Sequence, residues 1–131
     1  GEIEKGLLDG VANALPALTQ AQTYQKRVAR VGFDWPEIGG TLDKICEEIE
    51  ELRSAPDDEA RASELGDMLF SVVNLARWLD IDAESALRES NARFRSRFAK
   101  VEQSARRSER ELSEMSIDEL EDLWNDAKGI N

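Results

Sequence analysis

The sequence contains no histidine and only one cysteine, Cys46, and each shortage excludes a class of chemistry. Without histidine, neither Ser-His-Asp nor Cys-His nucleophilic catalysis can operate, and nearly every kind of zinc site is excluded. A lone cysteine cannot form an internal disulfide, so a reducing cytoplasm is the expected setting. Any catalysis by this chain therefore has to use carboxylates, basic side chains and hard metal ions.

Long apolar runs are also absent. No stretch approaches the ~20 apolar residues that a bilayer-spanning helix needs, and the N-terminus lacks the layout of a signal peptide. Acidic side chains are abundant instead. The chain has 28 acidic and 17 basic side chains, which gives a net charge of -11. This charge disfavours binding to nucleic acid or to an anionic membrane, and it suits a protein that binds cations. The length of 131 residues fits one domain over residues 1–131.

Apolar residues recur with helical spacing, and no segment alternates as a half-buried strand does. Helices are expected from about Leu15-Pro16 to Gly32, from Thr41 to Arg53, from Asp58 to Leu79, within 83–110, and over 116–128. The last of these opens on a capping box, Ser116-Ile117-Asp118-Glu119. Residues 1–13 are interpreted as a lead-in, and residues 102–115 as a charged extension or linker. The sequence thus predicts an all-α bundle of four to five helices.

Two helices carry more apolar surface than one small chain readily covers. The third expected helix has an apolar stripe at spacings of three and four, formed by Leu65, Met68, Leu69, Val72, Val73, Ala76 and Leu79. In the fourth, Phe94 and Phe98 belong to a coiled-coil-like seam that also includes Asn91. We therefore expect the bundle to be completed by homodimerisation.

The chemistry concentrates in two acidic clusters, Glu47-Glu48-Ile49-Glu50-Glu51 and Glu64-Leu65-Gly66-Asp67. If the two helices fold back about the Pro56-Asp57 turn, residues whose numbers add to the same total lie at matching heights. Glu51 with Glu64, and Glu48 with Asp67, both satisfy this condition. The arrangement predicts that four carboxylates converge on a small volume between the helices.

Such a cluster would be strongly repulsive, because two like charges ~4 Å apart cost about 4 kcal/mol at an effective dielectric of ~20. Protonation can relieve part of this repulsion, and so can a divalent cation. Mg²⁺ and Mn²⁺ prefer carboxylate and water oxygens, whereas di-iron bundles use Glu-x-x-His patterns that a histidine-free chain cannot supply. The competing interpretation is that these glutamates form an ordinary solvated helix face.

At this point the sequence resembles the MazG family. The acidic clusters resemble its signature, EExxE followed by EExxD, and the flanking stretches match its C-terminal-type domain over about residues 7–128. These stretches include Leu15-Pro16-Ala17-Leu18, Val31-Gly32-Phe33-Asp34-Trp35, Gly66-Asp67-Met68-Leu69-Phe70, Val73-Asn74-Leu75-Ala76-Arg77 and Asn91-Ala92-Arg93-Phe94-Arg95-Ser96-Arg97-Phe98.

The resemblance implies a dimeric, all-α enzyme that hydrolyses nucleoside triphosphates to monophosphate and pyrophosphate with Mg²⁺, or with Mn²⁺. It implies four metal ligands: Glu48, Glu51, Glu64 and Asp67. It also implies that the nucleotide is bordered by Lys44, Glu47, Arg93, Arg97 and Trp124. The attacking water is then expected to be oriented or deprotonated by a carboxylate such as Glu47 or Glu51.

One position departs from the signature, since Ser63 replaces the first glutamate of the second cluster. This departure keeps a second interpretation open, a non-catalytic helical module for metal binding or protein interaction. Arg93 and Arg97 lie four residues apart on one helix face, where they suit phosphate but would also suit surface ion pairs. Trp35 could stack on a base, although packing of its loop is the simpler role.

Overall fold

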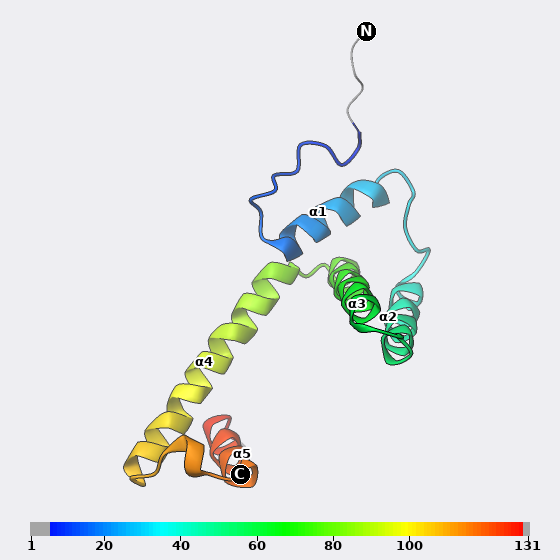
Figure 1. The fold of residues 1–131 in the computed structure, drawn as a ribbon. Helices are drawn as coiled ribbons and strands as arrows, with labels where there is room; N and C mark the ends of the chain where they lie inside the picture. The colour runs from blue at the N-terminus through cyan, green and yellow to red at the C-terminus, as the bar shows by residue number, and fades with distance from the viewer. Residues whose placement is uncertain (1–5, 130–131) are drawn as a thin grey trace. The chain divides into compact units, whose positions relative to one another are not determined.

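The computed structural model describes residues 6–129, and within this range the chain is helical and has no strands (Figure 1). The elements are α1 (Ala17–Ala29), α2 (Ile38–Arg53), α3 (Asp58–Trp78), α4 (Ala83–Arg107), the short 3₁₀ helix η1 (Leu112–Glu114) and α5 (Ile117–Ala127). The predicted all-α class is therefore confirmed. The chain divides into two compact units at the Ala86–Leu87 step, which falls inside α4.

The helix ends follow from local sequence. The Asp57 side chain caps α3 by accepting a hydrogen bond from the Ala60 N–H at 2.8 Å. The predicted capping box is present at α5, where Ser116 and Glu119 exchange side-chain and backbone hydrogen bonds. Gly32 has a φ of 89° just beyond α1, a left-handed conformation that glycine adopts at little cost. These residues set where the helices begin and stop.

Helix α2 begins at Ile38, three residues before the expected start at Thr41. Gly39 and Gly40, which we expected in the loop, therefore lie in its first turn. Glycine usually disfavours a helix, so a tertiary contact has to offset that preference here. The ring of Trp35 lies against Gly40 and supplies such a contact.

In the first unit, α2 and α3 form an antiparallel hairpin about the short connection at residues 54–57, and α3 also packs against α1. Two buried glutamines hold α1 in place. The Gln22 side chain donates to the Ile81 carbonyl at 2.7 Å and accepts from the Ala83 N–H at 2.9 Å. The Gln25 amide nitrogen donates to the Phe70 carbonyl at 2.8 Å. The Ile81 carbonyl and the Ala83 N–H lie at the junction of α3 and α4, so without Gln22 these backbone groups would be unpaired.

The second unit contains most of α4, η1 and α5. Val101 and Ala105 are buried on α4, so the helix keeps an apolar inner side almost to its end. Helix α5 returns along α4, since the rings of Phe94 and Trp124 lie 5.3 Å apart. Helix α4 continues to Arg107, which makes the first six residues of the segment 102–115 helical.

Much of the apolar stripe on α3 is not covered within this chain. The helical spacing of this stripe predicts one buried face, but among its apolar residues only Val73 is buried, while Leu65, Leu69, Val72 and Leu79 are exposed. The reason is that α3 contacts α2 and α1 on its other sides. None of the described helices combines the length and apolar character that a bilayer span requires.

Candidate functional site

The α2–α3 hairpin brings three of the predicted ligands together. One carboxylate oxygen from each of Glu48, Glu51 and Glu64 lies within 4.8 Å of the others. Glu48 and Glu51 come from α2, one turn apart, and Glu64 comes from the facing part of α3. Such a group of oxygens from two helices is suited to a hard divalent cation.

The three glutamates differ in their access to solvent. Glu48 is buried, with 3% of its surface exposed, whereas Glu64 is half-buried and Glu51 is exposed. The Glu48 Oε2 and Glu64 Oε2 atoms are buried and have no hydrogen-bond partner in the part of the chain that the structure describes. Buried carboxylate oxygens without partners carry a large desolvation cost, which a bound cation would offset. The donor set therefore fits a metal ion.

Lys44 is the basic neighbour of this cluster. Its Nζ lies 3.0 Å from Glu48 Oε1 and 3.6 Å from Glu47 Oε1, one turn along α2. The hydrogen bond from Lys44 lowers the pKa of Glu48, and the same contact raises the pKa of Lys44. Glu48 is therefore held as a carboxylate in spite of its burial.

The pKa of Glu64 is shifted in the opposite direction to that of Glu48. Its pKa is raised to about 7, first by the shared hydrogen bond with Glu51, then by burial, and then by Glu48. The physical cause is that neighbouring carboxylates disfavour another negative charge, so a proton stays on Glu64 up to near neutral pH. The cluster thus relieves its own repulsion by protonation when no cation is bound.

The fourth predicted ligand, Asp67, is not among these three clustered carboxylates. Asp67 is exposed on α3, as is Ser63, the residue that departs from the family signature. Asp67 lies beside the apolar stripe of α3, and that stripe is itself largely exposed. Matching height in the hairpin does not fix the direction in which a side chain points.

The other predicted substrate residues lie in two places. Lys44 and Glu47 are on α2 beside the carboxylates, where Glu47 is exposed. Arg93, Arg97 and Trp124 belong to the second unit, Arg93 and Arg97 on α4 and Trp124 on α5. There the Trp124 ring packs against Phe94, which in turn stacks on Phe98 at 6.1 Å.

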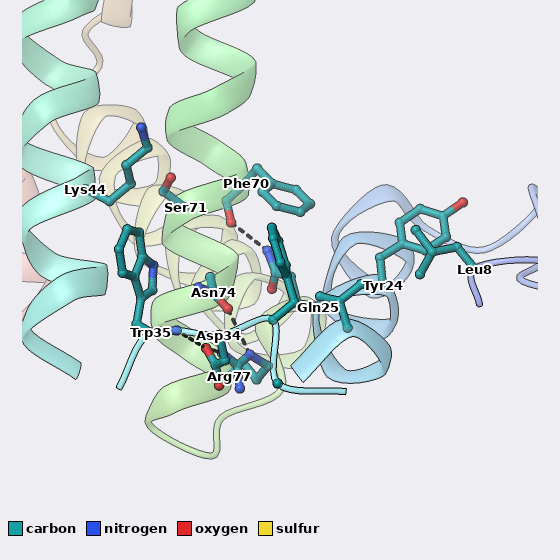
Figure 2. Close-up of a pocket in the computed structure, with 13 residues that line it drawn as sticks. Leu8, Tyr24, Gln25, Asp34, Trp35, Lys44, Phe70, Ser71, Asn74 and Arg77 are labelled. Atoms are coloured by element: carbon teal, nitrogen blue, oxygen red, sulfur yellow. Dashed lines mark hydrogen bonds and ion pairs between the residues drawn. The ribbon is translucent and has the colours of Figure 1, made fainter. Parts of the chain in front are cut away.

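Sequence reasoning missed a cavity of about 670 Å³ in the first unit. Its wall combines side chains from α1, α2, α3 and the 30–37 loop, with Trp35, Phe33, Tyr24 and Phe70 as its aromatic residues. Figure 2 shows Trp35 and Lys44 toward α2, Tyr24 and Leu8 toward α1, and Ser71 and Asn74 on α3 between them. The aromatic loop between α1 and α2 was the only signal of it in the sequence.

An ion-pair network fixes the loop that lines this cavity. Arg77 of α3 pairs with the Asp34 carboxylate and also donates to the Asn74 amide oxygen at 2.8 Å. The same Asp34 oxygen accepts a hydrogen bond from the Trp35 N–H at 2.8 Å. The Trp35 ring in turn lies against Gly40, since a Cβ at that glycine would be 3.0 Å from the ring.

A helical hairpin that clusters three glutamates makes this chain an all-α protein with a carboxylate group that could hold a metal ion. Comparison with known families makes the assignment narrower. Residues 39–102 match the MazG nucleotide pyrophosphohydrolase domain, which confirms the resemblance noted in the sequence.

Curated relatives carry the corresponding names. The chain is 43% identical over 115 residues to the nucleoside triphosphate pyrophosphohydrolase/pyrophosphatase MazG of Thermotoga maritima, covering 88% of this chain and 45% of the relative. It is 42% identical over 126 residues to the nucleoside triphosphate pyrophosphohydrolase of Escherichia coli K12, covering 92% and 48%. The chain therefore spans about half the length of these curated relatives.

A third relative has no assigned activity in its name. This chain is 42% identical over 129 residues to the uncharacterized protein YabN of Bacillus subtilis, covering 95% of this chain and 26% of the relative. The same stretch thus occurs within proteins of quite different lengths.

Proposed function

We propose that this chain hydrolyses nucleoside triphosphates to nucleoside monophosphate and pyrophosphate in a reaction that depends on Mg²⁺ or Mn²⁺. The observation that carries the proposal is the cluster of Glu48, Glu51 and Glu64, whose oxygens lie within 4.8 Å of one another. The names of the Thermotoga maritima and Escherichia coli relatives support the reaction.

In this proposal the metal is held by Glu48, Glu51 and Glu64, with Asp67 as a fourth ligand from α3. When bound, the cation supplies positive charge for the phosphate oxygens and lowers the pKa of a coordinated water. Because the chain has no histidine, an acidic side chain has to accept the proton of the attacking water. Glu47 and Glu51 are exposed beside the buried Glu48, so either could reach that water.

The remaining groups are proposed to bind the substrate. Lys44 lies at the edge of the cluster, where its ammonium group would be available to a phosphate if Glu48 held a cation. Arg93 and Arg97 are proposed to contact the phosphates through their planar guanidinium groups, with Trp124 beside the nucleotide. The proposed physiological role is cleaning of the nucleotide pool in the cytoplasm, without nucleic-acid or membrane partners.

We also propose that the protein acts as a homodimer. Leu65, Leu69 and Val72 form an exposed apolar row along α3, and Phe94 on α4 is 60% exposed. An exposed apolar row such as the one on α3 is usually covered in a functional protein. Packing of these helices against a second copy would bury it.

The decisive experiment measures pyrophosphate and monophosphate release from a panel of nucleoside triphosphates with Mg²⁺. We expect both products from the natural sequence, and a loss of about 100-fold or more for Glu48→Gln, because even the outer partners of metal ligands contribute ~10–100-fold. Asp67→Asn tests the fourth ligand and is expected to show a similar loss. Glu50→Gln is the matched control, since Glu50 is an exposed acid of α2 paired with Arg53 outside the cluster.

Thermal unfolding provides a second readout that does not need the substrate. Mg²⁺ or Mn²⁺ should raise the Tm of the natural sequence and of Glu50→Gln, with ~2.7 kcal/mol of stabilisation at 100 times the Kd. The rise should be absent in Glu48→Gln and reversed by a chelator. A metal-induced rise without product from any triphosphate would favour the non-catalytic metal-binding module that Ser63 leaves open.

A further inference from the structure

The cavity beside Trp35 lies next to the carboxylate cluster, and Lys44 belongs to both. Lys44 lines the cavity, and its Nζ lies 3.0 Å from Glu48 Oε1. A molecule in the cavity therefore has one end close to the proposed metal site. The adjacency of the cavity and the carboxylates indicates what the cavity holds. The inference rests on the proposed function only for the triphosphate and the metal on the far side of Lys44.

The chemistry of the wall narrows the choice of ligand. Aromatic and aliphatic side chains dominate it, with Trp35, Phe33 and Tyr24 contributed by α1 and the loop that follows. Its volume of about 670 Å³ lies within the ~300–1,000 Å³ range typical of small-molecule sites. Such a wall suits a flat heteroaromatic ring, because a ring can stack on an indole or phenyl face irrespective of its hydrogen-bonding edge.

A few polar groups are placed to meet the edge of such a ring. The Asn74 amide oxygen is used by Arg77, so the amide nitrogen of Asn74 is the group left to donate to a ligand. Ser71, one turn earlier on α3, adds a hydroxyl to the wall. The apolar wall with a small number of oriented polar groups is typical of a specific ligand site.

We propose that this cavity binds the base and sugar of the nucleoside triphosphate, with Trp35 as the stacking residue and Asn74 and Ser71 at the base edge. The triphosphate then leaves the cavity past Lys44 toward Glu48 and its neighbours. The proposal gives the first unit both halves of a substrate site, one apolar and one anionic. It makes Trp35 and Asn74 specificity-determining residues that the carboxylate signature does not reveal.

The test uses nucleosides, which lack phosphate and therefore do not need the metal. Saturation-transfer NMR is recorded for adenosine, guanosine, cytidine and uridine with the full chain and no divalent cation. We expect transfer to the base protons of at least one nucleoside, equally in the natural sequence and in Glu48→Gln. This readout remains informative even if no triphosphate is hydrolysed, so failure of the proposed reaction and failure of this inference are distinguishable.

Two variants change the cavity in opposite ways. Trp35→Ala removes the stacking face and should weaken nucleoside binding about 5-fold or more, in line with the value of base stacking on aromatic side chains. Val28→Phe fills part of the cavity from α1 and should reduce binding as well. Val31→Ala is the matched control, because Val31 is exposed in the same loop but does not line the cavity.

Two results would contradict a nucleoside site in this cavity. No transfer to any nucleoside at millimolar concentration, with helicity retained by circular dichroism, would show that the cavity is not a nucleoside site. Equal transfer in the natural sequence, Trp35→Ala and Val28→Phe would place the nucleoside elsewhere. For an active enzyme, Trp35→Ala should also raise KM about 5-fold or more and flatten the kcat/KM differences between the bases, with kcat little changed.

Discussion

The ring of Trp35 lies so close to Gly40 that a methyl group at position 40 would be 3.0 Å from Cδ2 and 3.1 Å from Cε3. Contacts this short are tighter than ordinary van der Waals packing, so one partner has to move when the side chain is added. Gly40 therefore allows the first turn of α2 to support the loop that lines the cavity. Its neighbour Gly39 has no such role, since the nearest atom to its added Cβ is Glu37 Oε1 at 3.7 Å.

This difference predicts opposite behaviour for two adjacent Gly→Ala changes. Gly39→Ala should raise the free energy of unfolding by up to about 1 kcal/mol, the usual gain in helix propensity. Gly40→Ala should gain less or lose stability, because the indole ring is displaced. In a Trp35→Ala background the two changes should become equivalent, which a double-mutant cycle in urea measures. Identical gains in both backgrounds would contradict the contact between the Trp35 ring and Gly40.

The raised pKa of Glu64 predicts how stability depends on pH in the absence of divalent cations. Its pKa is about 7 in the folded chain against an ordinary value of 4.5, so between these values the folded state binds more protons than the unfolded state. Stability should therefore fall as pH rises from about 4.5 to about 7, and level off above that. The Tm measured in chelator from pH 5 to pH 8 should show this decline.

Two variants isolate the contribution of Glu64 to that decline. Glu64→Gln removes the titrating group and should flatten the profile, leaving the variant more stable than the natural sequence at pH 8. Glu50→Gln, an exposed acid on the same hairpin, should leave the slope unchanged. Excess Mg²⁺ should also reduce the slope, because metal binding requires the deprotonated form. An unchanged slope in Glu64→Gln would assign the titration to another group.

The capping box of α5 gives a prediction about the second unit. Ser116 Oγ accepts from the Glu119 N–H at 3.1 Å, and Glu119 accepts from the Ser116 N–H at 3.3 Å while also pairing with Arg110. Ser116→Ala should cost about 1 kcal/mol, or about fivefold in the opening equilibrium of α5. Amide hydrogen exchange across α5 measures this loss of protection. Ser113→Ala, an exposed serine of η1, should change protection little.

The sequence was most informative where structure depends on local rules. The start of α3, the α5 capping box and the approach of Glu51 to Glu64 all follow from short-range patterns and a short turn. Asp67 shows the limit of that reasoning, because a matched position along the hairpin sets height and leaves the facing direction open. For Glu48, the pairing with Lys44 is predictable because both residues lie one turn apart on α2. The burial of Glu48 is not predictable in this way, because it depends on how the helices pack.

The cavity was not predictable in this way because its wall is assembled from distant segments. Asp34 and Arg77 are 43 residues apart, and Gln25 and Phe70 are 45 apart, so no periodicity relates either pair. The early start of α2 also depends on a contact that no periodic pattern reveals. Two glycines indicated a loop, and the Trp35 contact favoured a helix at that point. Long-range contacts outweighed a weak local preference.

The position of Lys44 has a thermodynamic consequence. Because one ammonium group contacts Glu48 and also lines the cavity, a ligand that shifts Lys44 alters the charge felt by the carboxylates. By linkage, any factor by which a cavity ligand changes cation affinity equals the factor by which the cation changes affinity for that ligand. The cavity and the carboxylate cluster would then bind their ligands cooperatively, so that filling the cavity changes the affinity of the cluster for its cation.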